Sequence, residues 1–144
     1  MRRASWLVMG LVVLVALLVG LQPDEDEFYM ANLNQHREQA LYPDGTSHGL
    51  TGAEADALYT ETMLAEVLPV IGAYPVLAGN YSHLVLGSDA AWDSFALVRY
   101  PGLPEFLGMV ASPRFQELVV NKGAGLARGS SMRTAAVNAL SLEQ

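Results

Sequence analysis

The 144-residue sequence contains no cysteine, and this absence excludes several kinds of chemistry. Without thiols the chain can form no disulfide, no thiolate nucleophile and no cysteine-ligated zinc or iron–sulfur centre. A lipid-modified cysteine anchor is excluded for the same reason. Stability must therefore come from packing within the chain or from association with another subunit.

Basic residues are scarce after the N-terminal region. From Asp24 onward the chain has six basic and fifteen acidic residues, so acidic residues exceed basic ones by nine. A protein of that charge repels phosphate backbones, which argues against a nucleic-acid partner. Most of the acidic residues precede Val67, so we expect any anionic ligand to bind the second half of the chain.

Metal-binding and nucleophile motifs are also missing. His36, His48 and His83 lie on separate segments without HxxxH, HxH or HxxE spacing, so no metal site is predicted and hydrogen-bonding or surface roles are favoured. Haem ligation would need one of them, and His83 is the least implausible. The sequence has neither a Gly-x-Ser-x-Gly elbow nor a phosphate-binding loop. No cofactor is predicted.

The segment from Ala4 to Pro23 contains no charged residue, and it directly follows Arg2 and Arg3. Roughly 20 helical residues at ~1.5 Å each reach about 30 Å, the thickness of the hydrocarbon core of a bilayer. The two arginines favour the cytoplasmic side. Residues 1–23 are therefore predicted to be a single membrane anchor, N-in and C-out, with the domain on the periplasmic or extracellular side.

A cleaved secretory signal is the alternative for this segment. Such a signal normally ends in a small-x-small cleavage site, whereas this run ends Leu-Leu-Val-Gly-Leu-Gln-Pro at Pro23. An uncleaved anchor is therefore favoured over secretion after cleavage. Residues 24–144 are long enough for one domain with its own core.

The hydrophobic pattern of residues 24–144 predicts alternating strands and helices. Strands are expected at 27–34, 74–86 and 92–100, with a turn at Gly87–Asp89, and a last strand is expected within 126–137. A capping box at Thr51 and Glu54 begins a helix, which Pro69 should kink or end. A second helical region begins near Pro104, restarts at Ser112-Pro113 and ends at Gly123.

This order predicts an α+β protein with a ferredoxin-like βαββαβ fold, an antiparallel sheet with two helices on one face. The strand from Trp92 to Tyr100 carries large apolar residues on both sides. One helical layer covers one face of the sheet, so the other face is expected to meet a partner sheet or to line a ligand pocket. A homodimer through that face is predicted.

Several segments resemble one known domain family. They are WDSFALVRYP (Trp92 to Pro101), Phe106 and Met109, Ser112 to Gln116, Ala124 to Leu126, and the earlier Asn32-Leu33, Tyr42 to Gly45 and Thr51 to Ala55. Together they resemble the domain family of unknown function DUF 1330, a branch of the dimeric α/β-barrel proteins. The resemblance implies a dimeric ferredoxin-like fold. The wider superfamily includes cofactor-free enzymes, haem enzymes and non-enzymatic proteins, so the resemblance does not choose an activity.

The chain departs from this family where relatives tend to carry a His-Arg pair, because it has Asn121-Lys122-Gly123 there. A histidine acid or base is therefore not carried over to that position.

Five polar residues are candidates for a site between the sheet and the helices. Arg99 could clamp a carboxylate or enolate, Tyr59 or Tyr100 could donate a proton, and Asn32 and Lys122 could bind the ligand. The structural alternative is that Tyr59 belongs to the core and Arg99 pairs with an acid across the dimer.

Two functional classes follow from these candidates. One is a membrane-tethered, metal-independent enzyme acting on a small organic substrate. The other is a non-enzymatic module that binds a small molecule or serves as a scaffold. An enzyme needs a pocket with converging polar groups, whereas a scaffold can fill that space with apolar side chains.

Overall fold

The computed structural model describes residues 27–82 and 91–134. Within them it contains four strands and three α-helices, in the order β1 (Phe28–His36), α2 (Gly52–Thr62), β2 (Tyr74–Asn80), β3 (Ser94–Tyr100), α3 (Leu103–Ala111), α4 (Pro113–Gly125) and β4 (Leu126–Thr134). The anchor predicted for residues 1–23 and the turn predicted at Gly87–Asp89 lie outside the described residues. No helix in the described part of the chain is long and apolar enough to cross a membrane.

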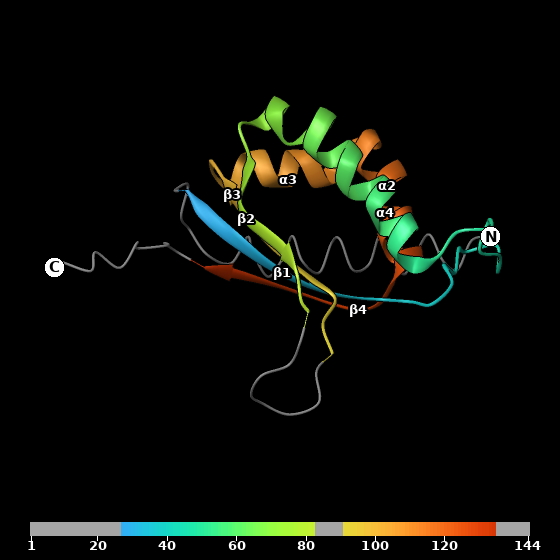
Figure 1. Cartoon of the computed structure of the whole chain (residues 1–144). Coiled ribbons are helices and arrows are strands. Elements are labelled where there is room, and N and C mark those ends of the chain that lie inside the picture. The colour runs from blue at the N-terminus through green and yellow to red at the C-terminus, as the bar shows by residue number, and fades with distance from the viewer. Residues whose placement is uncertain (1–26, 83–90, 135–144) are drawn as a thin grey trace, which may run out of the picture.

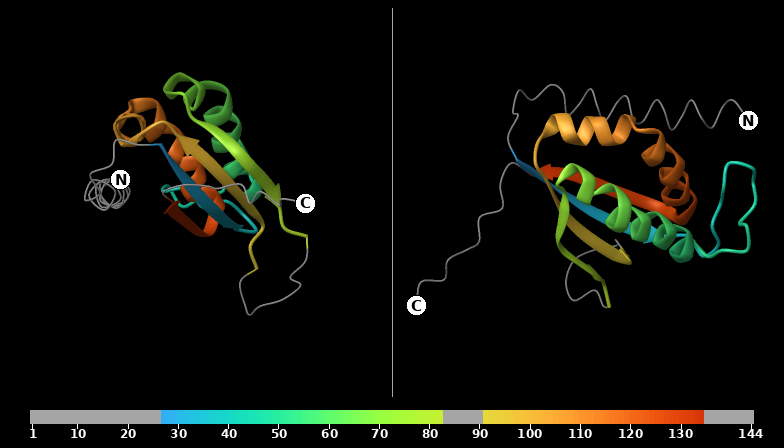
Figure 2. Two further views of the ribbon diagram at one scale, coloured as in Figure 1. Left: turned by 90° about the vertical axis from the view of Figure 1, so that its left-hand side faces the viewer. Right: turned by 90° about the horizontal axis from the view of Figure 1, so that it is seen from above.

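The strands form one antiparallel sheet in the order β2-β3-β1-β4, and the helices lie on one of its faces (Figure 1). Helices α2 and α4 run side by side across this face, as the view from above shows (Figure 2). The predicted order of strands and helices is confirmed, and the arrangement is compatible with a ferredoxin-like fold. The predicted second helical region is two helices, α3 and α4, because Ser112 and Pro113 interrupt it.

The core lies between the sheet and the helices. Alternation along β1 and β3 turns Phe28, Met30, Val98 and Tyr100 toward the helices, and all four are buried. The ring of Phe28 stacks on Tyr100 at a centroid distance of 5.3 Å, and Phe106 from α3 meets both rings edge-on. Such aromatic packing stabilises the core by about 0.5–1.5 kcal/mol per pair beyond the area buried.

The helical segment that starts with α2 begins and ends where the sequence predicts. The capping box is formed, because Glu54 N–H donates to Thr51 Oγ1 while Glu54 Oε2 accepts from Thr51 N–H. The helix continues as a wider π-helical turn (Met63–Val67) and a 3₁₀ turn (Pro69–Ile71), and it stops at Gly72 with φ of 71°. This left-handed conformation favours glycine, so Pro69 tightens the last turn and Gly72 ends it.

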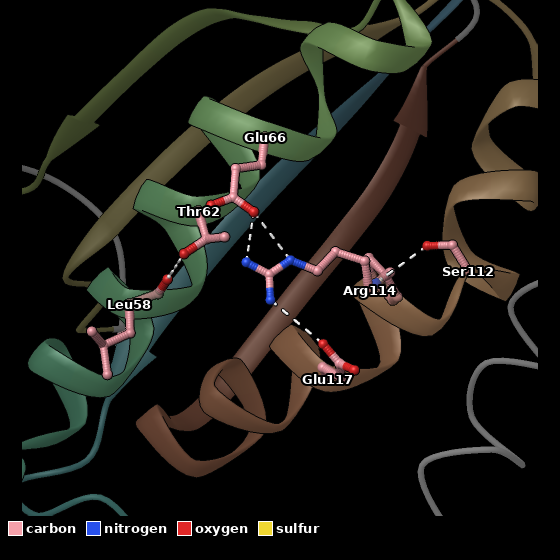
Figure 3. A network of polar contacts seen from close by, with 7 residues as sticks. Leu58, Thr62, Glu66, Ser112, Arg114 and Glu117 are labelled. Carbon is pink, nitrogen blue, oxygen red and sulfur yellow. Dashed lines mark hydrogen bonds and ion pairs between the residues drawn. The ribbon is translucent and has the colours of Figure 1, made fainter.

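An ion-pair network links the two long helical segments on the solvent side (Figure 3). Arg114 of α4 donates from Nη2 and Nε to Glu66 Oε2 at 2.6 and 3.1 Å, and from Nη1 to Glu117 at 3.5 Å. All three side chains are exposed, so screening by water keeps the contribution to stability small. The network favours one relative orientation of α2 and α4.

The face of the sheet away from the helices carries many apolar side chains. Its exposed or half-buried side chains come from all four strands and include Tyr29, Leu33, Tyr74, Leu77, Phe95, Leu97 and Met132. Leu77 is 58% exposed, which is unusual for a leucine on a sheet. We call this surface the open sheet face.

The predicted strand 74–86 corresponds to β2, which ends at Asn80.

Three backbone segments meet where β1 ends, α2 begins and α4 ends. Arg37 N–H donates to Gly125 O at 2.8 Å, and Gly52 N–H donates to Arg37 O at 3.2 Å. A Cβ at Gly125 would lie 2.4 Å from Gly52 O, and a Cβ at Gly52 would lie 2.3 Å from Arg37 O. Only glycine fits at both positions, because the backbones approach within the space that a side chain needs.

This contact predicts opposite effects for two glycines of α4. Gly125→Ala should lower the free energy of unfolding by about 1–3 kcal/mol, because overpacking forces the backbones apart. Gly123→Ala should raise it by about 0.5–1 kcal/mol, because a Cβ at Gly123 meets no atom within 4 Å and alanine is the better helix former. Urea unfolding of the domain from Asp24 onward measures both. Equal effects would contradict the backbone contact.

Candidate functional site

A histidine–aspartate pair connects the end of β1 to α2. His36 Nε2 lies 2.9 Å from Asp56 Oδ2, and Asp56 is only 5% exposed. The other carboxylate oxygen, Oδ1, is buried and has no hydrogen-bond partner in the described part of the chain. A buried carboxylate that binds an imidazole N–H fixes the tautomer and the orientation of the ring.

The other edge of the His36 ring faces a second carboxylate and the surface. Asp93 Oδ2 accepts the backbone N–H of His36 at 2.7 Å and lies 3.8 Å from Nδ1. The surface there has an open depression, lined by His36, Arg37, Glu38, Ala53, Asn80 and Asp93. His36 therefore lies between a buried acid and an open depression of the surface.

Lys122 of α4 lies on the same side of the sheet, against α2. Its Nζ is 5.1 Å from the centroid of the Tyr59 ring. Burial lowers the pKa of Lys122, and the negative charge of Asp56 opposes this effect. Burial also raises the pKa of Tyr59, so its hydroxyl stays protonated and can donate. We call His36, Asp56, Tyr59 and Lys122 the helix–sheet cluster.

Arg99 and Asn32 make their hydrogen bonds to residues outside this cluster. Arg99 lies on the open sheet face, where Nε donates to Glu27 at 2.7 Å and Nη1 donates to Gly72 O at 3.1 Å. Asn32 lies on the helix-facing side of β1, where its Oδ1 accepts from Ser131 Oγ at 2.7 Å. The structure therefore brings Tyr59 and Lys122 together and places Arg99 on the opposite face.

Tyr100 is part of the core. Its ring is buried between Phe28 and Phe106, and burial raises the pKa of its hydroxyl to about 12. Arg99 and Tyr100 are neighbours on one strand, so they point to opposite faces of the sheet. The two residues cannot act on one small molecule from that strand.

The sequence carried weak signals for His36 and Asp56. Strand β1 runs two residues past its predicted end at Asn34, and its alternation from Phe28 then puts His36 on the helix-facing side. Asp56 precedes Tyr59 by three positions, so a helical period puts both on one face of α2. The sequence did not distinguish Asp56, which is buried, from the exposed acidic residues around it.

The arrangement can perform acid–base chemistry. It offers an imidazole oriented by a buried carboxylate, a phenol donor and a half-buried amine within one layer of the fold. Within the two described ranges, no group of three or more His, Asp or Glu side chains could hold a metal ion.

The lowered pKa of Lys122 makes a pH-dependent prediction. The folded protein releases this proton at a lower pH than the unfolded chain, whose lysine titrates near 10.5. Between these pKa values the unfolded chain binds more protons, so wild-type stability rises with pH. The stability of Lys122→Met relative to wild type should therefore fall as the pH rises from neutrality toward that value. Urea unfolding of both proteins measures the difference, and a pH-independent difference would contradict burial of the charge.

Two solved structures of one protein resemble most of this chain. The RPA0582 protein of unknown function from Rhodopseudomonas palustris is 28% identical, with a TM-score of 0.76 over 87% of this chain and 93% of its own. The methylated RPA0582 protein is also 28% identical and gives a TM-score of 0.78 over 86% and 90%.

An uncharacterized NIPSNAP-like domain protein from Burkholderia xenovorans is 15% identical over 79% of this chain and 88% of its own, with a TM-score of 0.46. That likeness is too distant to support an inference. No family model matches the chain, and no curated protein matches it. The chain thus shares its fold with a protein of unknown function.

Proposed function

We propose that this chain is a metal-independent, dimeric α/β-barrel protein of the DUF 1330 type that transfers a proton on a small organic molecule. The observation that supports this proposal is the pairing of His36 with the buried Asp56. Burying a carboxylate costs stability unless the carboxylate has a partner. A histidine with only a surface role would not need a buried carboxylate as that partner.

In this proposal His36 is the general base and Asp56 orients it. Asp56 accepts the Nε2 proton of neutral His36, which leaves Nδ1 to accept a proton from a molecule in the depression. Lys122 and Tyr59 do not line the depression, and their contribution is to the electrostatics around Asp56, with which both side chains interact through charge.

A base-sensitive probe tests the role of His36. The compound 5-nitrobenzisoxazole loses one ring proton to a general base and opens to a coloured nitrophenolate. The wild-type chain should accelerate this opening, and His36→Gln should lose about a hundredfold of that acceleration, because general bases contribute on that scale. The initial rate of colour formation in detergent micelles measures the effect.

His48 provides the matched control, because its Nε2 also lies 2.9 Å from a carboxylate, that of Asp44, but on the exposed surface. His48→Gln should leave the rate unchanged. Circular dichroism checks that both variants are folded. Equal losses in the two variants, or a wild-type rate no higher than that of His36→Gln, would contradict the proposed base.

The open sheet face supports a second role, as a surface for homodimer formation. Apolar side chains of four strands lie together on it, and Tyr74, Leu77, Tyr81 and Met132 are each about half exposed. Patches of this kind usually mark an interface. A scaffolding module would use the same face without any chemistry in the helix–sheet cluster.

We also propose that residues 1–23 anchor the protein in a membrane, N-in and C-out, with the domain on the periplasmic or extracellular side. The support is the uncharged run from Ala4 to Pro23 behind Arg2 and Arg3. Secretion after cleavage is the alternative.

The homodimer predicts a difference between two leucines. Leu77→Glu places a charge on the open sheet face and should convert the dimer to a monomer. Leu58→Glu is the matched control, because Leu58 is 46% exposed on α2, away from that face. Light scattering of the domain from Asp24 onward measures the molar mass. A wild-type domain that stays monomeric at high micromolar concentration would overturn the dimer.

A further inference from the structure

Lys122 is the only lysine among the 144 residues, since the other seven basic residues are arginines. It lies in the last turn of α4, half-buried, with Nζ over the ring of Tyr59. Among the described residues, no ion pair or hydrogen bond holds Nζ. An amine that has no ion-pair partner among the described residues and is not fully buried is open to reaction.

We propose that Lys122 binds small carbonyl compounds covalently, as an imine between Nζ and the carbonyl carbon of an aldehyde or ketone. The inference rests on the proposed function only in using the same cluster. The unprotonated Nζ attacks the carbonyl carbon and gives a carbinolamine. The C–O bond then breaks as the C=N bond forms, and the carbonyl oxygen leaves as water with the two hydrogens of the amine. No oxidant, reductant or metal is needed.

The surroundings of Lys122 favour this reaction. Only the neutral amine attacks a carbonyl, and burial, which lowers the pKa of Lys122, raises the neutral fraction near neutral pH. The guanidinium groups of arginines stay charged and do not compete.

The neighbouring side chains indicate the class of carbonyl compound. The Tyr59 ring under Nζ packs edge-on against Phe115 at a centroid distance of 6.3 Å, and both belong to or border the hydrophobic core. A ligand joined to Nζ would therefore lie beside aromatic side chains. An aryl or aliphatic aldehyde fits these surroundings better than a charged sugar or phosphate compound.

Borohydride trapping tests the imine. The full chain in detergent micelles is incubated at neutral pH with benzaldehyde and reduced with sodium borohydride, and peptide mass mapping locates the benzyl group. Mapping separates Lys122 from the α-amino group of Met1. We expect a benzyl adduct on Lys122 that is lost in Lys122→Met.

A relocated lysine gives the matched control. The double variant Lys122→Met and Ala127→Lys carries its single lysine on β4, where Ala127 is exposed. Its lysine should be labelled more slowly than Lys122 at neutral pH, because an exposed amine stays protonated. The absence of a Lys122 adduct, or labelling no faster than in the double variant, would overturn the inference.

His36→Gln separates this inference from the proposed function. It should remove the proton transfer measured with 5-nitrobenzisoxazole and leave benzaldehyde trapping at Lys122. Trapping without His36-dependent proton transfer in the wild-type chain would contradict the proposed function alone. Proton transfer without trapping would contradict the imine alone.

Discussion

The meeting of three backbones at Arg37, Gly52 and Gly125 determines where the side chains of the helix–sheet cluster lie. The hydrogen bonds through Arg37 join the end of β1 to α2 and α4, with no room for a Cβ at either glycine. His36 precedes Arg37 by one residue, Asp56 follows Gly52 by about one helical turn, and Lys122 precedes Gly125 by slightly less than a turn. The helix–sheet cluster is therefore assembled around this contact, although its members come from three elements.

The sheet then divides the polar residues between two faces. Alternation puts His36 and Asn32 on the helix-facing side with the core residues Phe28 and Met30, and it puts Arg99 on the open sheet face with Tyr29. On that face, hydrogen bonds from Tyr29 and Arg99 lower the pKa of Glu27, so a charged network occupies one end of this surface. The proposed chemistry and the proposed association therefore belong to opposite faces of the sheet.

The sequence predicted the fold better than the site, and the reason is physical. Strand alternation, the Thr51–Glu54 capping box and the break at Ser112–Pro113 are local features, and each appears in the structure as predicted. A site depends on which elements meet. Strand alternation predicts that Arg99 and Tyr100 point to opposite faces of the sheet. The pairing of His36 with Asp56 joins residues 20 positions apart, and no sequence motif marks it. Only the backbone contact near Gly52 brings those two together.

The helix–sheet cluster places charge where an apolar residue would stabilise the fold more. Asp56 is buried with one oxygen unpaired in the described part of the chain, and burial disfavours the charged form of Lys122. Nearby, Ala55 and Ala124 show that small apolar side chains fit the same α2–α4 interface. A carboxylate and an amine that cost stability, where β1, α2 and α4 converge, support the proposal that this cluster acts on a bound molecule. The same reasoning does not extend to Arg99 or Arg114, whose charges are paired on the surface and cost the fold little.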